Sequence, residues 1–121
     1  MAFKFNAQVS VAHALPLPLN GYGLGEPYYD WDSFEESAKL RIERQLHSSA
    51  EIGRKMGVHI NSVFLGGTVS IAESLITSSE KEKADMIVMG SRGIGGFRGL
   101  MMGSVSQAVA AHSKIPVLIV K

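Results

Sequence analysis

Residues 84–104 read ADMIVMGSRGIGGFRGLMMGS, and this stretch decides the fold. It begins with an apolar run, Ala84–Gly90, that predicts a buried strand. Six of the 13 glycines then fall within residues 90–103. Ser104 opens a helical pattern, with Gln107 three positions later as in a capping box. A buried strand that passes through a glycine-rich segment into a helix is typical of parallel α/β proteins.

The remaining chain alternates between strand and helix patterns. The predicted strands cover residues 8–15, 58–65, 84–90 and 116–120, and the predicted helices cover residues 32–56, 70–83 and 104–112. Asp32, Ser70 and Ser104 are the predicted N-caps, Gly57 is the predicted end of the first helix, and Gly66-Gly67 is expected to break the second strand. An apolar stripe on the first helix is expected to face the core, and its members are Phe34, Ala38, Ile42 and Leu46. Strands alternating with helices predict right-handed crossovers and a mainly parallel sheet with helices on both faces.

The composition limits the classes of protein that fit. A chain of 121 residues with 45% hydrophobic residues is expected to form one domain, residues 1–121, with one core. A net charge of +1 argues against nucleic-acid binding by bulk positive charge. The lack of cysteine excludes disulfides, thiolate catalysis and cysteine-ligated metals. No apolar run reaches the length of a membrane span, so we expect a cytoplasmic protein without membrane or nucleic-acid partners.

The glycine-rich segment predicts phosphate binding. Glycines let backbone N–H groups approach a ligand closely, and the following helix adds unpaired donors and a positive dipole end. No lysine follows Gly103, so the segment is not a Walker A loop. It also lacks the third glycine of a dinucleotide fingerprint. Ser104 is expected to cap the helix, to donate to a phosphate, or both. The competing interpretation is that the glycines only allow tight turns.

The same segment resembles a known family. Gly90, Gly93, Gly103 and Ser104 form the pattern Gly-x2-Gly-x9-Gly-Ser, and the flanking strand and the segment up to residue 120 fit the same template. In this the chain resembles the ATP-binding subgroup of the universal stress protein family. The resemblance implies a three-layer, Rossmann-like open parallel sheet of the adenine nucleotide alpha hydrolase type. It also implies ATP as ligand, alone or with Mg²⁺.

The resemblance assigns roles to individual residues. The four pattern residues would hold the triphosphate. Met89 would lie near the nucleotide, and Ala14, at the end of the first strand, would contact the adenine side. Homodimers would form through the last strand, Val117–Val120. An apolar edge strand also has to be covered for a general reason, because its unpaired backbone groups otherwise pair with other chains. Arg92 would either reach phosphate oxygens or remain solvated.

The family also sets an expectation for the N-terminus. Its members begin with a strand and a helix, and Met1–Ala7 resembles only the tail of that helix. The family's first central strand is therefore expected to be missing from this chain. Three explanations stay open: a start upstream of Met1, a strand supplied by another chain, or a sheet that closes the gap. We expect weaker ATP binding than in an N-terminally extended chain.

Other residues carry little chemistry. The four histidines show no metal-ligand spacing. The aromatic loop Tyr22–Trp31 is expected to cover the nucleotide or a neighbouring subunit, or else to be a mobile surface loop. No carboxylate stands beside the glycines as a base, and Asp85 lies at the wrong end of its strand to hold Mg²⁺. The resulting hypothesis is an ATP-binding regulator in stress response that acts on an unknown protein partner. The alternatives are a dimerisation module that binds no nucleotide, and a weak ATPase.

Overall fold

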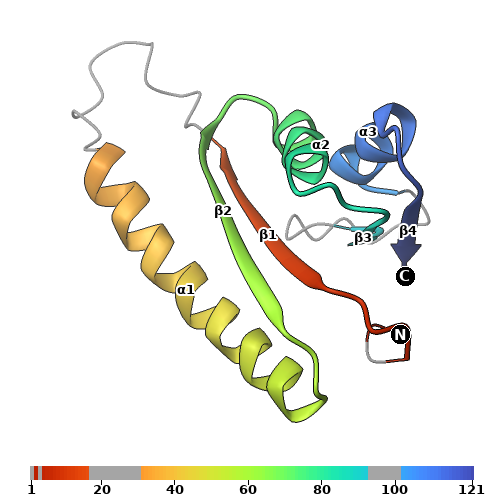
Figure 1. Cartoon of the computed structure of the whole chain (residues 1–121). Helices are drawn as coiled ribbons and strands as arrows, with labels where there is room; N and C mark the ends of the chain where they lie inside the picture. Colours follow the sequence, from red (N-terminus) through yellow and green to blue (C-terminus); the bar gives the residue numbers. More distant parts are fainter. Residues whose placement is uncertain (1, 3, 17–30, 93–101) are drawn as a thin grey trace, which may run out of the picture. The chain divides into compact units, whose positions relative to one another are not determined.

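A computed structural model describes residue 2 and residues 4–16, 31–92 and 102–121 (Figure 1). The elements are β1 (Val9–Pro16), α1 (Trp31–Lys55), β2 (Ile60–Thr68), α2 (Ile71–Lys81), β3 (Ile87–Gly90), α3 (Ser104–His112) and β4 (Val117–Val120). Strand β1 pairs with β2 and strand β3 with β4, and both pairs are parallel. Parallel strands joined through helices confirm the α/β, Rossmann-like fold class. The chain divides into two compact units, residues 1–69 and 70–121, which we describe separately.

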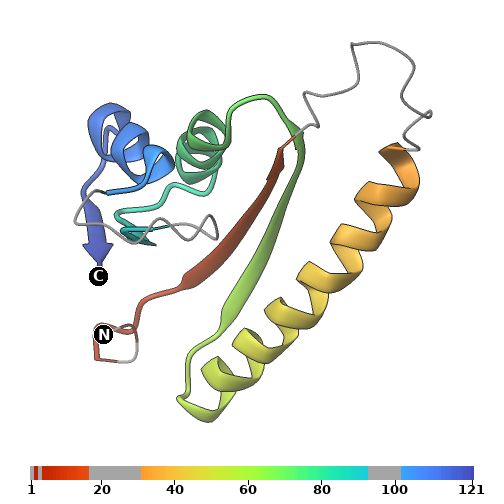
Figure 2. The same ribbon diagram turned by 180° about the vertical axis from the view of Figure 1, so that it is seen from behind.

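In the first unit, α1 runs along the β1–β2 pair, as two opposite views show (Figures 1 and 2). The pairing runs from Val9 opposite Ile60 to Ala14 opposite Leu65. The predicted apolar stripe is confirmed at three positions whose side chains are buried, Ala38, Ile42 and Leu46. A two-stranded sheet is marginal in water, so this helix face supplies much of the unit's core.

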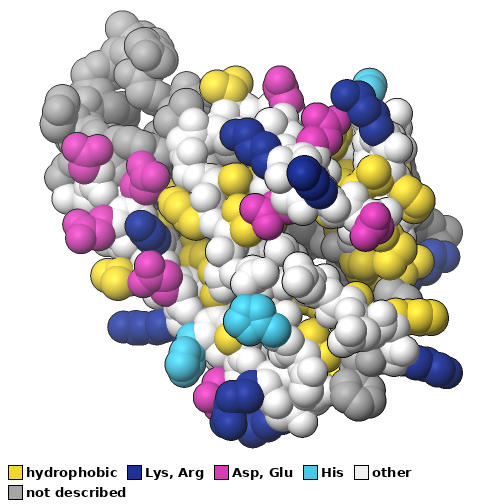
Figure 3. All heavy atoms as spheres, viewed as in Figure 1, with side chains coloured by type: hydrophobic (Ala, Val, Ile, Leu, Met, Phe, Trp, Pro, Cys, Tyr) yellow, Lys and Arg dark blue, Asp and Glu magenta, His cyan; other side chains and the backbone are white. Residues whose placement is uncertain are grey.

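Helix α1 starts and ends one residue earlier than predicted, and Gly57 terminates it as expected. It begins at Trp31, so Asp32 lies in the first turn instead of at the N-cap. At the other end Gly57 has a φ of 72°, and Val58 N donates to Gly53 O at 2.8 Å. This is the Schellman motif, which satisfies the last helical carbonyls. Figure 3 shows acidic side chains gathered near the start of α1 and basic ones near its end, the arrangement that complements the helix dipole.

The expected break of the second strand at Gly66-Gly67 is wrong. Strand β2 continues to Thr68. Its register against β1 shifts between Ala14 and Pro16, so that Ala14 pairs with Leu65 and Pro16 with Thr68. Strand β2 therefore has one more residue than β1 in this stretch, which is a β-bulge. Gly67, with a φ of 64°, adopts the left-handed conformation that a bulge can require of glycine.

In the second unit, α2 and α3 contact each other. The most buried side chains are Val109, at 0% exposure, and two serines, Ser106 at 4% and Ser78 at 9%. Ser70 caps α2 as predicted, since its hydroxyl accepts from Glu73 N at 3.3 Å. A buried patch shared by two helices gives this unit its core.

Strand β3 is shorter than predicted because the end of α2 uses the residues before it. Ala84 N donates to Ser79 O at 2.9 Å, and Lys83 N to Glu80 O at 3.1 Å, with Lys83 at a φ of 52°. These bonds form a second Schellman motif. They occupy the start of the apolar run, so the strand begins only at Ile87.

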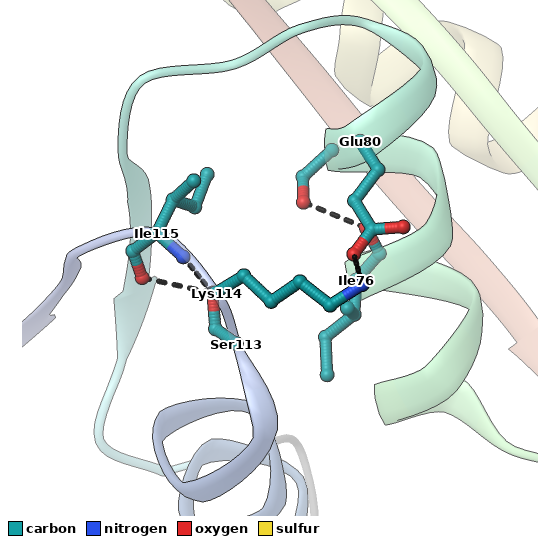
Figure 4. Close-up of polar contacts among 6 residues, drawn as sticks. Ile76, Glu80, Ser113, Lys114 and Ile115 are labelled. Atoms are coloured by element: carbon teal, nitrogen blue, oxygen red, sulfur yellow. Dashed lines mark hydrogen bonds and ion pairs between the residues drawn. The ribbon is translucent and has the colours of Figure 1, made fainter.

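The turn before β4 is held to α2. Lys114 Nζ lies 3.1 Å from Glu80 Oε1, and the two side chains reach toward each other in Figure 4. Ser113 Oγ donates to Ile115 O at 2.9 Å and accepts from Ile115 N at 3.2 Å. The predicted last strand begins one residue later, at Val117, directly after Pro116.

Within the described ranges, no helix is both long and apolar enough to cross a membrane.

Candidate functional site

The carboxyl end of β3 lies beside the first turn of α3. Gly103 N donates to Ser91 O at 2.7 Å, and Ser106 Oγ donates to Gly90 O at 2.8 Å. Ser91 N in turn donates to Val120 O at 2.9 Å, which ties the same point to the end of β4. We call residues 90–92 and 102–106 the β3–α3 junction. Its place, beyond the carboxyl ends of two parallel strands, is where α/β proteins bind ligands.

The helix α3 begins on a glycine. The N-cap is Gly103, not the predicted Ser104, and among the described residues no side chain forms a capping hydrogen bond there. The structural reason is that Ser104 already lies inside the helix, as its first residue. The first backbone bond of the helix runs from Gln107 N to Gly103 O at 2.9 Å. The N–H groups of residues 104–106 therefore have no acceptor within the helix.

The charge at this end of α3 suits an anion. The first turn of α3 contains no acidic residue, whereas the first turn of α2 contains Glu73. Arg92 is exposed at the end of the junction and takes part in neither ion pair of the described residues. Unpaired N–H groups and the positive end of a helix dipole bind phosphate without further charged groups.

The glycines of the junction are not explained by strain. Gly103 has φ −61° and ψ 154°, values that any residue adopts. A Cβ atom added at Gly90 would have its nearest neighbour, Arg92 O, at 3.5 Å, an ordinary contact. The interpretation that these glycines only allow tight turns thus has no support at either position. At these two positions the backbone therefore tolerates a side chain as far as the described residues show.

The other predicted site residues differ in how far they can be placed. Met89 is half-buried in β3, next to the junction, and Ser104 is exposed at the start of α3. Ala14 belongs to the first unit, near the end of β1. Gly93, and the aromatic loop up to residue 30, lie outside the described residues.

Two side chains in or next to the junction form bonds that the sequence analysis did not predict. Ser106 is buried and bonded to Gly90, and its signal in the sequence is a polar residue three positions before Val109 on the same helix face. Gln107 was expected to reach back to the N-cap, as in a capping box. Its Nε2 donates instead to Met102 O at 2.7 Å, one residue before the cap.

The described residues offer no metal centre. In residues 4–16, 31–92 and 102–121, no three His, Asp or Glu side chains lie close enough to hold a metal ion. Asp85 is exposed and precedes β3, whose opposite end forms the junction. Groups of the described junction that could contact an anion include backbone N–H groups, the exposed Ser104 hydroxyl and Arg92.

Comparison with known proteins agrees with the geometry. The universal stress protein family matches over residues 1–121. The "universal stress protein in QAH/OAS sulfhydrylase 3′region" of Thermus aquaticus is 40% identical over 95% of this chain and 78% of its own length. A universal stress protein solved in complex with cAMP has a TM-score of 0.67 and 25% identity, over 99% of this chain and 81% of its own. The Archaeoglobus fulgidus universal stress protein in complex with dAMP has a TM-score of 0.65 and 23% identity, over 99% and 78%.

The family model matches over residues 1–121, and the relative from Thermus aquaticus is 40% identical over 95% of this chain. On these grounds the chain belongs to the universal stress protein family.

Proposed function

We propose that this chain binds an adenine nucleotide, with ATP as the first candidate, at the β3–α3 junction and acts as a nucleotide-dependent regulator in stress response. The observation that carries the proposal is the uncapped amino end of α3. Its N-cap is a glycine, and its first turn has no acidic side chain. A phosphate would supply the acceptors that the helix itself lacks.

The ligand class follows from chemistry and from the relatives. The N–H groups of residues 104–106, with the exposed Ser104 hydroxyl, suit phosphate oxygens, and Arg92 adds a positive charge at the rim. The structural neighbour at 25% identity was solved with cAMP, which joins an adenine base to a phosphate. The neighbour from Archaeoglobus fulgidus, with dAMP, adds a second adenine nucleotide. In our proposal Gly90, Gly93, Gly103 and Ser104 hold the phosphates, with Met89 nearer the base.

The regulatory part of the proposal concerns β4. Among the described strands, β4 is hydrogen-bonded to β3 alone, so its other edge is open to a second chain. We propose that homodimers form through this edge, Val117–Val120. The bond from Ser91 N to Val120 O, at 2.9 Å, joins the junction to the end of that strand. A nucleotide that orders the junction would thereby favour one state of the dimer edge and change contacts with a protein partner.

Calorimetric titration tests the binding proposal. We expect the chain to bind ATP, and to bind adenosine at least about tenfold more weakly because adenosine lacks phosphate. Gly103→Leu should lower ATP affinity at least about tenfold while the fold persists, because its φ of −61° accepts a side chain. The matched control is Ser70→Ala at the start of α2, which should leave ATP affinity unchanged. Absence of saturable ATP binding by the parent chain would refute the proposal.

Sedimentation tests the dimer. Ile87 N and Ser91 N donate to the carbonyls of residues 116 and 120, so every second residue of β4, counted from residue 116, faces β3. Ile119 lies between two such residues, and its N–H therefore points to the open edge of β4. We expect Ile119→Pro to weaken association while the bonds to β3 remain. If the parent chain sediments as a monomer with and without ATP, the dimer proposal is wrong.

A further inference from the structure

The buried hydroxyl of Ser106 makes an unusual connection. Ser106 is 4% exposed, and its Oγ donates at 2.8 Å to the carbonyl of Gly90, sixteen residues earlier. Ile87 N and Ser91 N both donate to carbonyls at β4, so every second residue from Ile87 to Ser91 faces β4. Gly90 lies out of phase with them, and its carbonyl therefore points to the other edge of β3. The serine hydroxyl therefore satisfies a carbonyl that the β3–β4 ladder leaves without a partner.

Two further bonds fix the other end of the glycine-rich segment. Gly103 N donates to Ser91 O at 2.7 Å, and Gln107 Nε2 donates to Met102 O at 2.7 Å. The residues before and after the segment are thus held at the first turn of α3. Of the three bonds, only that of Ser106 joins a side chain of the helix to the strand.

We infer that Ser106 is a positioning residue of the nucleotide site, an inference that rests on the proposed function. Its hydroxyl is engaged with Gly90, so it does not contact the nucleotide. It fixes the end of β3 relative to α3, which keeps the N–H groups of residues 104–106 and the backbone of Ser91 and Arg92 arranged around one phosphate. Donors that are held in place before binding cost less entropy when the ligand arrives.

The alternative is that Ser106 only stabilises the fold. Removal of its hydroxyl takes away the donor of the part-buried bond to the Gly90 carbonyl, and the loss of such a bond costs stability in any protein. Loss of stability therefore does not separate the two roles. The positioning role predicts a loss of nucleotide affinity in protein that remains folded, together with a local loosening of the junction.

Three variants separate the roles. Ser106→Ala removes the donor, and Ser106→Thr keeps it. Ser78→Ala removes an equally buried serine of the same unit, on α2 outside the junction, where Ser78 is 9% exposed. We expect ATP affinity to fall about tenfold in Ser106→Ala, and to stay within about threefold of the parent in the other two. Without nucleotide, hydrogen exchange of the Gly103 amide should accelerate about tenfold in Ser106→Ala alone.

The outcomes are distinguishable. If the parent chain binds ATP and Ser106→Ala binds it within about twofold, the positioning role is wrong while the proposed function stands. Equal losses of ATP affinity in Ser106→Ala and Ser78→Ala would show a general effect of buried serines, and would also overturn the positioning role. Unchanged exchange of the Gly103 amide would show that the hydroxyl does not fix the junction. If the parent chain binds no ATP, the proposed function fails first and the positioning role falls with it.

Discussion

Lys83 ends α2 in the left-handed conformation, with a φ of 52°, where Gly57 ends α1 with a φ of 72°. Asn6 adopts the same conformation, with a φ of 50°, next to a bond from Ala7 N to Ala2 O at 2.9 Å. Glycine has no Cβ and tolerates this conformation, whereas lysine is strained by roughly 1 kcal/mol. The sequence predicted helix ends near both residues, but only at Gly57 does the residue type itself indicate the left-handed conformation.

Lys83→Gly should therefore raise the free energy of unfolding. Relief of the left-handed strain outweighs the larger entropy of glycine in the unfolded chain, for a gain of about 0.5–1 kcal/mol. Chemical denaturation measures it. The control is Glu82→Gly at the C-cap, whose φ of −74° is ordinary, so that glycine should destabilise there. Equal effects at the two positions would contradict the argument.

Gly53→Ala should lower the free energy of unfolding although alanine favours helices. A Cβ atom at this position of α1 would meet Ile60 Cδ1 at 2.6 Å and Val58 O at 2.8 Å. The carbonyl belongs to the Schellman turn and cannot move freely, so the loss should be about 1–3 kcal/mol. Thermal or chemical unfolding checks it. Gly90→Ala is the matched control, because a Cβ atom there would have its nearest neighbour at an ordinary 3.5 Å. A similar loss of unfolding free energy in Gly90→Ala would contradict the explanation.

At the scale of elements, the two helices of the second unit begin in opposite ways. Ser70 caps α2 through Glu73 N, whereas α3 begins on Gly103 without a side-chain cap. The same capping-box pattern in the sequence predicted a serine cap for both. It failed at α3 because the helix starts at Ser104 itself, and because Gln107 donates to the carbonyl of Met102. A capping-box pattern shows which side chains could form the capping bonds. It does not show whether those side chains bond to other groups instead.

Ser70→Ala and Ser104→Ala should separate the two kinds of helix start. Loss of the cap at α2 should cost about 1 kcal/mol of unfolding free energy. Ser104 caps nothing, so its replacement should change stability by less than about 0.5 kcal/mol while ATP affinity falls. Unfolding curves and titration of both variants provide the measurement. A large stability loss in Ser104→Ala would contradict the prediction, because it would show that the hydroxyl supports the fold.

At the scale of the whole molecule, hydrophobic periodicity predicted the order of strands and helices. Ala38, Ile42 and Leu46 repeat every four residues and are buried, so the pattern was sufficient to predict which face of α1 packs in the core. It was insufficient at Gly66-Gly67, where a β-bulge keeps the strand intact through hydrogen bonds to β1 that no local pattern encodes. The glycine spacing predicted the junction as the site, whereas the bond from Ser106 to Gly90 depends on tertiary structure and was not foreseen.

The central claim is that adenine nucleotides bind through the backbone of the β3–α3 junction. Titration of the ¹⁵N-labelled chain with ATP, followed by its amide resonances, tests this claim most directly. We predict saturable shifts at the amides of residues 90–92 and 103–106, and no comparable change around the amino end of α2, which Ser70 caps. Adenosine should leave the amides of residues 103–106 nearly unmoved. Saturable shifts that avoid the junction, or no saturation at millimolar ATP, would contradict the account.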